Sequence, residues 1–192
     1  MWYNKNVVLC ANGIFVVLCL KGEFLMTYSE KKMNLFGSAA KCALVHCISS
    51  DFVMGAGIAK QFALAGVKKE LLSTYPQVWE GRGYCLHSSA GTKNADFPNG
   101  VFNLITKQYY YCKPTYDTMQ QALDSMKKQC AELNIEMLAM PMIGCGLDRL
   151  DWARVSKMVQ DTFRDTGIHI YVAIFEKQKT WTVSRNSPEV DR

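Results

Sequence analysis

Residues 43–59 read ALVHCISSDFVMGAGIA, and they hold the clearest indication of the fold class. The apolar run 43–48 is typical of a strand buried inside a sheet. A polar loop containing glycine follows, and from Gly57 to Leu72 the pattern is helical, with a break expected at Gly66. A buried strand that passes through a glycine loop into a helix is the building unit of α/β folds.

The same unit recurs along the rest of the chain. Short apolar runs predict further buried strands over residues 101–106, 136–142 and 168–175. Apolar residues three and four positions apart predict amphipathic helices over residues 115–133 and 151–164. Residues 80–100 are rich in Gly, Ser, Asn and Asp and predict a loop with one short strand around Tyr84. This alternation predicts a three-layer α/β fold.

Length and composition fit a single globular domain. The chain has 192 residues, of which 49% are hydrophobic and 20% charged. Its net charge of +5 is mildly basic, short of the concentrated excess of a dedicated nucleic-acid binder. A charge of this size suits a dianionic ligand such as a diphosphate.

The cysteine pattern favours a reducing compartment. The eight cysteines lie mostly inside apolar runs, and no C-x-x-C pair occurs in the sequence. We therefore expect free thiols, a cytoplasmic or nuclear location, no metal and no cofactor.

The apolar stretch Val7–Leu20 has several interpretations. It is too short and too interrupted for a confident membrane span, and a signal peptide would need a small-x-small cleavage site that the following residues do not offer. A hairpin that turns at Asn12-Gly13 is one alternative; an optional extension before a natural start at Met26 is another. We favour these two, and divide the chain into an N-terminal extension (1–25), one domain (26–176) and a polar C-terminal tail (177–192).

Two glycine loops carry the predicted chemistry. The first precedes the helix at Gly57, and the second, Ile143–Asp148, follows the predicted strand 136–142. Glycine lets backbone N–H groups come close to a phosphate, and the helix that follows adds unpaired N–H groups and partial positive charge. Both loops lie at carboxyl ends of strands, where open α/β sheets bind ligands. A dinucleotide fingerprint is disfavoured because Lys60 occupies the place of its third glycine.

The sequence resembles the macrodomain family, and within it the terminal ADP-ribose protein glycohydrolase branch. The resemblance covers residues 26–175 and predicts an α/β/α macrodomain with a mixed central sheet. Five motifs carry it, in family order: His46-Cys47-Ile48-Ser49, Met54-Gly55-Ala56-Gly57-Ile58-Ala59, Leu104-Ile105-Thr106-Lys107, Lys113-Pro114-Thr115-Tyr116 and Gly144-Cys145-Gly146-Leu147-Asp148-Arg149-Leu150.

The resemblance implies a role for individual residues. Lys107 looks like the family's nucleophile and Asp148 like its acid/base partner. Phe175 stands where this branch packs on adenine. The residues implied in substrate binding are Leu35, Ser49, Gly55, Ala56, Gly57, Ile58, Met142, Ile143, Gly144, Cys145, Gly146, Leu147 and Phe175.

Two substitutions depart from the family pattern. Asn34 stands where the family usually has an aspartate that accepts from the adenine amino group, and an amide carbonyl could accept more weakly. Met142 replaces a residue that is often basic in this branch. The catalytic pair is kept, so we expect an active enzyme.

The function implied is hydrolysis of mono-ADP-ribose from Glu or Asp esters on proteins, together with deacylation of O-acyl-ADP-ribose. The alternatives are a non-catalytic ADP-ribose-binding module, an ADP-ribose 1″-phosphate phosphatase, and removal of ADP-ribose from nucleic-acid bases. The expected partners are ADP-ribose and mono-ADP-ribosylated proteins, with ADP-ribosylated nucleic acid as the alternative. We expect a monomer that does not bind membranes.

Three other features have simpler interpretations. His46 lies in an apolar run and is expected to be a hydrogen-bonded core histidine. Cys145 has no identifiable partner histidine, so we expect a small residue and not a nucleophile. We expect the cluster Tyr109-Tyr110-Tyr111 to pack over a helix.

Overall fold

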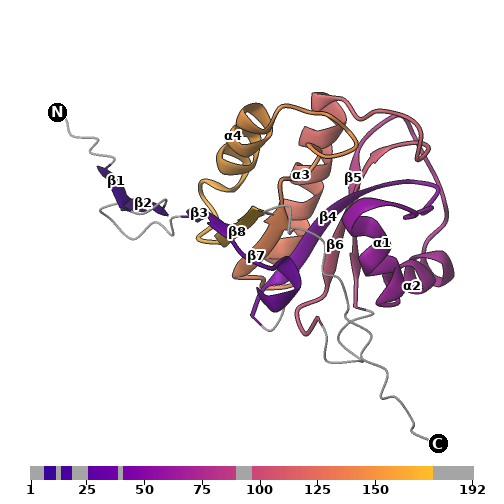
Figure 1. The fold of residues 1–192 in the computed structure, drawn as a ribbon, viewed down its shortest axis with the longest axis horizontal. Coiled ribbons are helices and arrows are strands. Elements are labelled where there is room, and N and C mark those ends of the chain that lie inside the picture. The colour runs from indigo at the N-terminus through magenta and orange to yellow at the C-terminus, as the bar shows by residue number, and fades with distance from the viewer. Residues whose placement is uncertain (1–6, 12–13, 19–25, 39–40, 90–96, 175–192) are drawn as a thin grey trace, which may run out of the picture.

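The computed structural model describes residues 7–11, 14–18, 26–38, 41–89 and 97–174 (Figure 1). They form one eight-stranded sheet in the order β1-β2-β3-β8-β7-β4-β6-β5. The strands are β1 (Val7–Ala11), β2 (Ile14–Leu18), β3 (Thr27–Lys32), β4 (Ala43–Ser49), β5 (Tyr84–Ser88), β6 (Val101–Lys107), β7 (Met137–Pro141) and β8 (His169–Ile174).

The sheet is mixed, as predicted. The neighbours from β3 to β6 run parallel, whereas β1, β2 and β5 pair antiparallel at the two edges. Because β7, β4 and β6 are adjacent and parallel, their carboxyl ends lie side by side at the same end of the sheet. Both glycine loops begin at this end.

Helices cover both faces of the sheet and complete three layers (Figure 1). They are α1 (Gly57–Leu64), α2 (Val67–Thr74), α3 (Tyr116–Glu132) and α4 (Trp152–Phe163), with a short 3-10 turn, η1 (Leu35–Ser38). The apolar faces of α3 and α4 bury one core against the sheet, and α1, α2 and η1 bury a second core on the other side. No helix in the described ranges is long and apolar enough to cross a membrane.

The helix boundaries follow the signals in the sequence. The predicted break at Gly66 is confirmed, since Gly66 has a φ of 96° and separates α1 from α2. Thr115 caps α3 in a reciprocal capping box with Thr118. Asp151 caps α4 by accepting from the Arg154 N–H. The helix boundary at Asp151 leaves Asp148 out of the cap and inside the second glycine loop.

The N-terminal strands pair as a hairpin would. β1 and β2 are antiparallel with Ala11 opposite Ile14, and β2 continues onto β3. The proposed turn residues, Asn12 and Gly13, lie outside the described residues. The division of the chain at residue 26 stays a prediction.

Candidate active site

A pocket of about 720 Å³ lies at the carboxyl ends of β4, β6 and β7. It collects both glycine loops and the end of β6. The lining residues are Cys47, Ile48, Ser49, Val53, Met54, Gly55, Ala56, Gly57, Ile58, Ala59, Lys107, Tyr110, Pro141, Met142, Ile143, Gly144, Gly146, Leu147 and Asp148.

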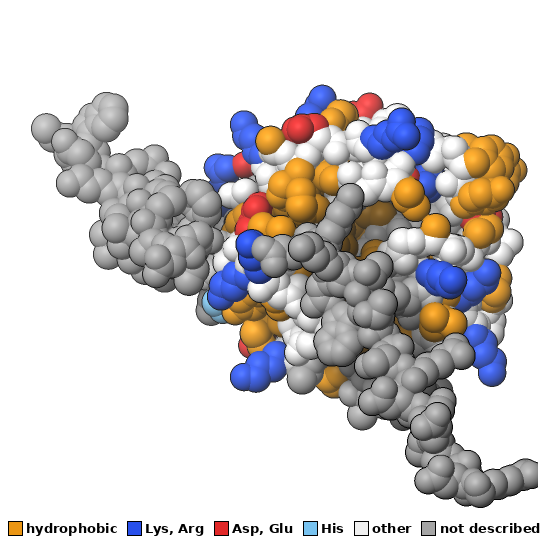
Figure 2. Space-filling model, viewed as in Figure 1, with side chains coloured by type: hydrophobic (Ala, Val, Ile, Leu, Met, Phe, Trp, Pro, Cys, Tyr) orange, Lys and Arg blue, Asp and Glu red, His pale blue; other side chains and the backbone are white. Residues whose placement is uncertain are grey.

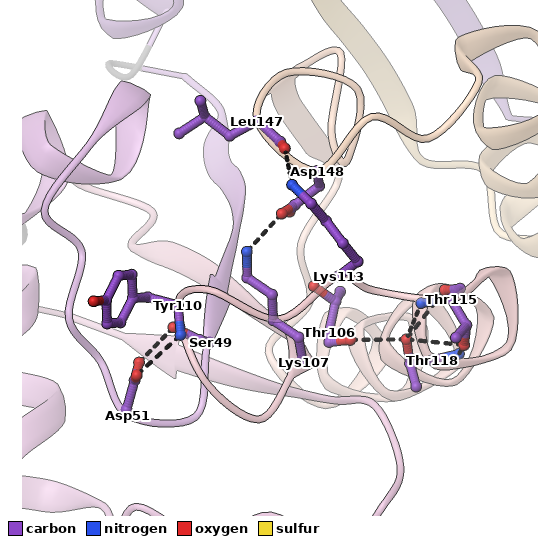
Figure 3. A network of polar contacts seen from close by, with 10 residues as sticks. All are labelled: Ser49, Asp51, Thr106, Lys107, Tyr110, Lys113, Thr115, Thr118, Leu147 and Asp148. Atoms are coloured by element: carbon purple, nitrogen blue, oxygen red, sulfur yellow. Dashed lines mark hydrogen bonds and ion pairs between the residues drawn. The ribbon is translucent and has the colours of Figure 1, made fainter.

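Lys107 and Asp148 form an ion pair in the wall of this pocket. Lys107 is the last residue of β6, and its Nζ lies 2.5 Å from Asp148 Oδ1 in the second glycine loop (Figure 3). The two side chains are only 11% and 13% exposed. Two residues 41 positions apart in sequence are thus brought into contact in the pocket wall, because β6 ends where the loop after β7 begins, at the same end of the sheet.

The first glycine loop has a strained backbone. Phe52 and Met54 take positive φ values of 49° and 47°, and Gly57 has a φ of 56°. Residues other than glycine rarely adopt this conformation, and it persists at functional sites where the surroundings enforce it. Burial of the Phe52 and Met54 side chains supplies that enforcement. Residues with a left-handed backbone conformation within a loop make successive N–H groups converge, and this is the geometry of a backbone anion site.

Asp51 holds this loop against the end of β6. Its Oδ1 accepts from the Ser49 hydroxyl at 2.5 Å and from the Val53 N–H at 3.3 Å, and its Oδ2 accepts from the Tyr110 N–H at 3.0 Å. The bonds to Ser49 and Tyr110 are drawn in Figure 3. The carboxylate therefore fixes the loop that follows β4 to the residues just after Lys107.

The second glycine loop is held by its own backbone. Gly144 has a φ of 72°, and a Cβ there would lie 2.7 Å from Met119 and 3.0 Å from Leu150. The Leu150 N–H donates to the Gly144 carbonyl at 2.9 Å. Gly146, in contrast, has no such neighbour within 4 Å. Gly144 is thus required by the fold, whereas Gly146 leaves open space at the pocket.

Both cysteines near the pocket are poor nucleophiles. Burial raises the pKa of Cys145 to about 11, and the nearby carboxylates of Asp151 and Asp148 add to this. Burial likewise raises the pKa of Cys47, with Asp148 again contributing. Because the thiolate is the reactive form, these thiols are inert at neutral pH. The Cys145 thiol donates to the Ile143 carbonyl at 3.2 Å. Cys145, unlike Ile143, does not line the pocket.

Two other residues with an implied ligand role, Leu35 and Asn34, lie outside the pocket lining. Leu35 is fully buried in the core beside α1 and does not line the pocket. Asn34 uses its side-chain oxygen to accept from the Phe36 N–H at 3.1 Å, which is a local contact at the start of η1. Phe175 lies outside the described residues.

The expectation for the tyrosine cluster is wrong. Tyr109, Tyr110 and Tyr111 are 42%, 61% and 66% exposed and pack on one another instead of over a helix. The rings of Tyr109 and Tyr111 stack with centroids 5.4 Å apart, and Tyr110 lines the pocket. The bond from the Tyr110 N–H to Asp51 holds the chain in a turn that exposes the three rings.

Pattern reading also missed Asp51 and Tyr110. Asp51 follows β4 by two residues and Tyr110 follows β6 by three, so their nearness to strand ends was the available signal. A lone acid in a loop has too many ordinary uses to be singled out from spacing alone, and the tyrosine cluster was assigned to packing.

The fold and the pocket together define a three-layer α/β ligand-binding domain whose site lies at the carboxyl ends of its central strands. Residues 45–159 match the family model described as Macro domain, so the chain belongs to the macrodomain family.

Relatives and solved structures agree with that assignment. The human protein ADP-ribose glycohydrolase OARD1 is 39% identical over 142 residues, which is 73% of this chain and 87% of that protein. The DNA ADP-ribosyl glycohydrolase of Thermus aquaticus is 24% identical over 68% of this chain and 36% of that protein. The solved macrodomain of Thermus aquaticus DarG has a TM-score of 0.64 at 23% identity, covering 77% of this chain and 98% of the other.

Proposed function

We propose that this protein is an ADP-ribosyl hydrolase that removes mono-ADP-ribose from Glu and Asp esters on proteins and deacylates O-acyl-ADP-ribose. The observation that carries the proposal is the ion pair between Lys107 and Asp148 in the pocket wall. The human relative named ADP-ribose glycohydrolase supports it. The diphosphate is assigned to the two glycine loops, whose N–H groups and helix N-termini suit an anion.

In the proposed mechanism Lys107 attacks the anomeric carbon C1″ of the distal ribose. Lysine is nucleophilic only as the neutral amine, so Asp148, whose oxygen lies 2.5 Å from Nζ, accepts the proton. The C1″–O bond breaks, and the acyl group leaves as a carboxylate with the bonding electrons. The sugar is then held on Lys107 through a C1″–N bond. The protonated Asp148 first loses its proton to solvent and then takes a proton from water, whose oxygen attacks C1″ as the C1″–N bond breaks. ADP-ribose leaves, and Asp148 returns the proton to the freed Lys107 amine.

Intact-mass analysis of two variants tests this mechanism. We expect Lys107→Ala to bind ADP-ribose but to give neither turnover nor adduct. We expect Asp148→Ala to attack slowly and to accumulate an adduct that peptide mapping places on Lys107. Lys60→Ala, which removes an exposed lysine of α1, is the matched control and should keep wild-type turnover.

The alternatives predict other results. Near-normal turnover of Lys107→Ala would exclude a lysine nucleophile and favour direct attack by water, as in a 1″-phosphate phosphatase. Binding of ADP-ribose with no turnover of any ester by the wild type would make the domain a binding module.

A second substrate class is favoured by the exposed tyrosines. Aromatic side chains at the open side of a site stack on nucleobases, and Tyr110 lines the pocket three residues after Lys107. The relative from Thermus aquaticus is named a DNA ADP-ribosyl glycohydrolase. In the view of Figure 2, however, Lys and Arg side chains are spread over the surface and not gathered in one patch. We therefore rank an ADP-ribosylated base second to a protein ester.

Paired assays distinguish the two classes. Tyr110→Ala should lower turnover of an ADP-ribosylated DNA oligonucleotide by about tenfold, since stacking on one base contributes about 1–3 kcal/mol. The same variant should hydrolyse an ester-modified peptide at close to the wild-type rate. Equal loss on both substrates would assign Tyr110 to ADP-ribose itself.

We also propose a monomeric protein of the cytoplasm or nucleus. Six cysteines lie in the ranges where side chains are described, and all six are free. Free thiols are typical of reducing compartments.

A further inference from the structure

The segment Lys113–Thr118 contacts the backbone beside both members of the proposed catalytic pair, although the mechanism assigns it no task. It comprises the last residues of the loop between β6 and α3 and the first turn of α3. The Thr118 hydroxyl donates to the Thr106 carbonyl at 2.8 Å, and Thr106 immediately precedes Lys107. The capping box with Thr115 holds Thr118 in place, so α3 fixes the end of the strand that carries the nucleophile.

Lys113 makes the matching contact on the other side of the pair. Its Nζ donates to the Leu147 carbonyl at 2.5 Å, and Leu147 immediately precedes Asp148. Figure 3 shows the amino end of Lys107 directed at the Asp148 carboxylate and the amino end of Lys113 directed at the Leu147 carbonyl. A hydrogen bond from an ammonium group is about twice as strong as one between neutral groups.

At the tip of the second glycine loop the Arg149 N–H donates to the Gly146 carbonyl at 3.3 Å, but side-chain packing there is sparse. The Leu147 side chain is 68% exposed, and a Cβ at Gly146 would meet nothing within 4 Å. Downstream, the loop is anchored where the Asp151 N–H donates to the Tyr116 hydroxyl at 3.2 Å. The hydrogen bond from Lys113 to the Leu147 carbonyl thus holds the peptide bond that joins Leu147 to Asp148, between the loop's anchor points at Gly144 and Asp151.

We propose that Lys113 is a positioning residue: by holding the Leu147 carbonyl it sets the carboxylate of Asp148 on the amine of Lys107. The proposal rests on the proposed function, because it gives Lys113 its effect through that pair. The hydrogen bond of Lys113 goes to the Leu147 carbonyl and not to Lys107 or to the Asp148 carboxylate. Misplacement of a reacting group by about 1 Å costs about 10²-fold in rate, so loss of this hydrogen bond should appear in turnover more than in binding.

Steady-state kinetics on an ester-modified substrate tests the proposal with three variants. Lys113→Met keeps the length of the stem but loses the donor, and should lower kcat by about 10- to 100-fold while KM changes less than about threefold. Lys113→Arg keeps a charged donor and should restore kcat to within about threefold of wild type. The matched control is Lys127→Met. Lys127 likewise donates to a residue distant in sequence, Asp165, at 2.6 Å, and neither residue lines the pocket. This control should keep wild-type kcat.

Each result decides a separate question. Wild-type kcat in Lys113→Met, measured beside an inactive Lys107→Ala, would overturn the positioning role and leave the proposed function standing. An active Lys107→Ala would instead overturn the proposed function. Equal impairment of Lys113→Met and Lys113→Arg, with unchanged melting temperature, would also refute positioning, because any donor of that reach should hold the carbonyl.

Discussion

Acidification should destabilise this protein through His46, whose environment fixes it in the neutral form. His46 is fully buried at the centre of β4 and stacks on Phe62 with ring centroids 4.1 Å apart. Its Nε2 lies 2.7 Å from Asn103 Oδ1, and the Asn103 amide nitrogen donates to the Leu86 and Val101 carbonyls. Asn103 must therefore accept from Nε2–H, so Nδ1 is the bare nitrogen, and it is buried with no hydrogen-bond partner.

Protonation would place a charge and an unpaired N–H in the core. Burial accordingly lowers the pKa of His46 from 6.5 to about 4, and the bond to Asn103 opposes this only in part. In the unfolded chain the ring takes up its proton below about pH 6.5. The stability that depends on neutral His46 is thus present above that pH and is lost as the pH falls toward about 4.

The loss can be worked out. Between about pH 7.5 and pH 5, the unfolded histidine is protonated across about 1.5 pH units while the folded one stays neutral. At about 1.4 kcal/mol per unit, the free energy of unfolding falls by about 2 kcal/mol.

Urea unfolding at the two pH values measures this loss, and the variant His46→Gln supplies the reference because it cannot titrate. We expect the wild type to lose about 2 kcal/mol more than the variant between the two pH values. Equal losses would refute the placement of a neutral, half-paired imidazole in the core.

Four further outcomes are expected. Gly146→Val should weaken ADP-ribose binding at least about tenfold by calorimetry with an unchanged melting temperature, since its Cβ enters open pocket space; normal affinity would move the diphosphate away from this loop. Thr115→Ala should lower the free energy of unfolding by about 1 kcal/mol in urea titrations, because the α3 capping box is lost, and a loss near zero would contradict that. Thiol titration of the unfolded protein should find all eight cysteines of the sequence free, and four disulfides in natively expressed material would revive the signal-peptide interpretation. Calorimetry with and without chelator should give the same ADP-ribose affinity, and lost binding on chelation would mean that a metal is required.

The three-layer fold and most element boundaries could be predicted from the sequence. Apolar runs and three-to-four spacing are local signals, and they place β4, β6, α3 and α4 within a few residues of where they lie. The order of the strands is not local. Nothing in residues 27–32 indicates that they pair with residues 169–174, and the family resemblance supplied only the expectation of a mixed sheet.

Some residues of the candidate site could likewise be predicted from the sequence, and others could not. The glycine loops could be recognised because two of them occur between a predicted strand and a predicted helix, which is the context of a phosphate site. Asp51, Tyr110 and Lys113 could not, since each acts through a backbone contact with a segment distant in sequence. Such a contact leaves no periodic pattern, and a single carboxylate, ring or ammonium in a loop usually faces water.

The pairing of β3 with β8 has a consequence for how the chain is made. Thr27 lies opposite His169, 142 residues away in sequence, and pairings of such high contact order form slowly. A ribosome adding about 5–20 residues per second completes the distance between these two strands in roughly 7–30 s. For that time β3 has no partner for one of its edges, and the nascent chain exposes a strand edge of the kind that invites aggregation or capture by a chaperone.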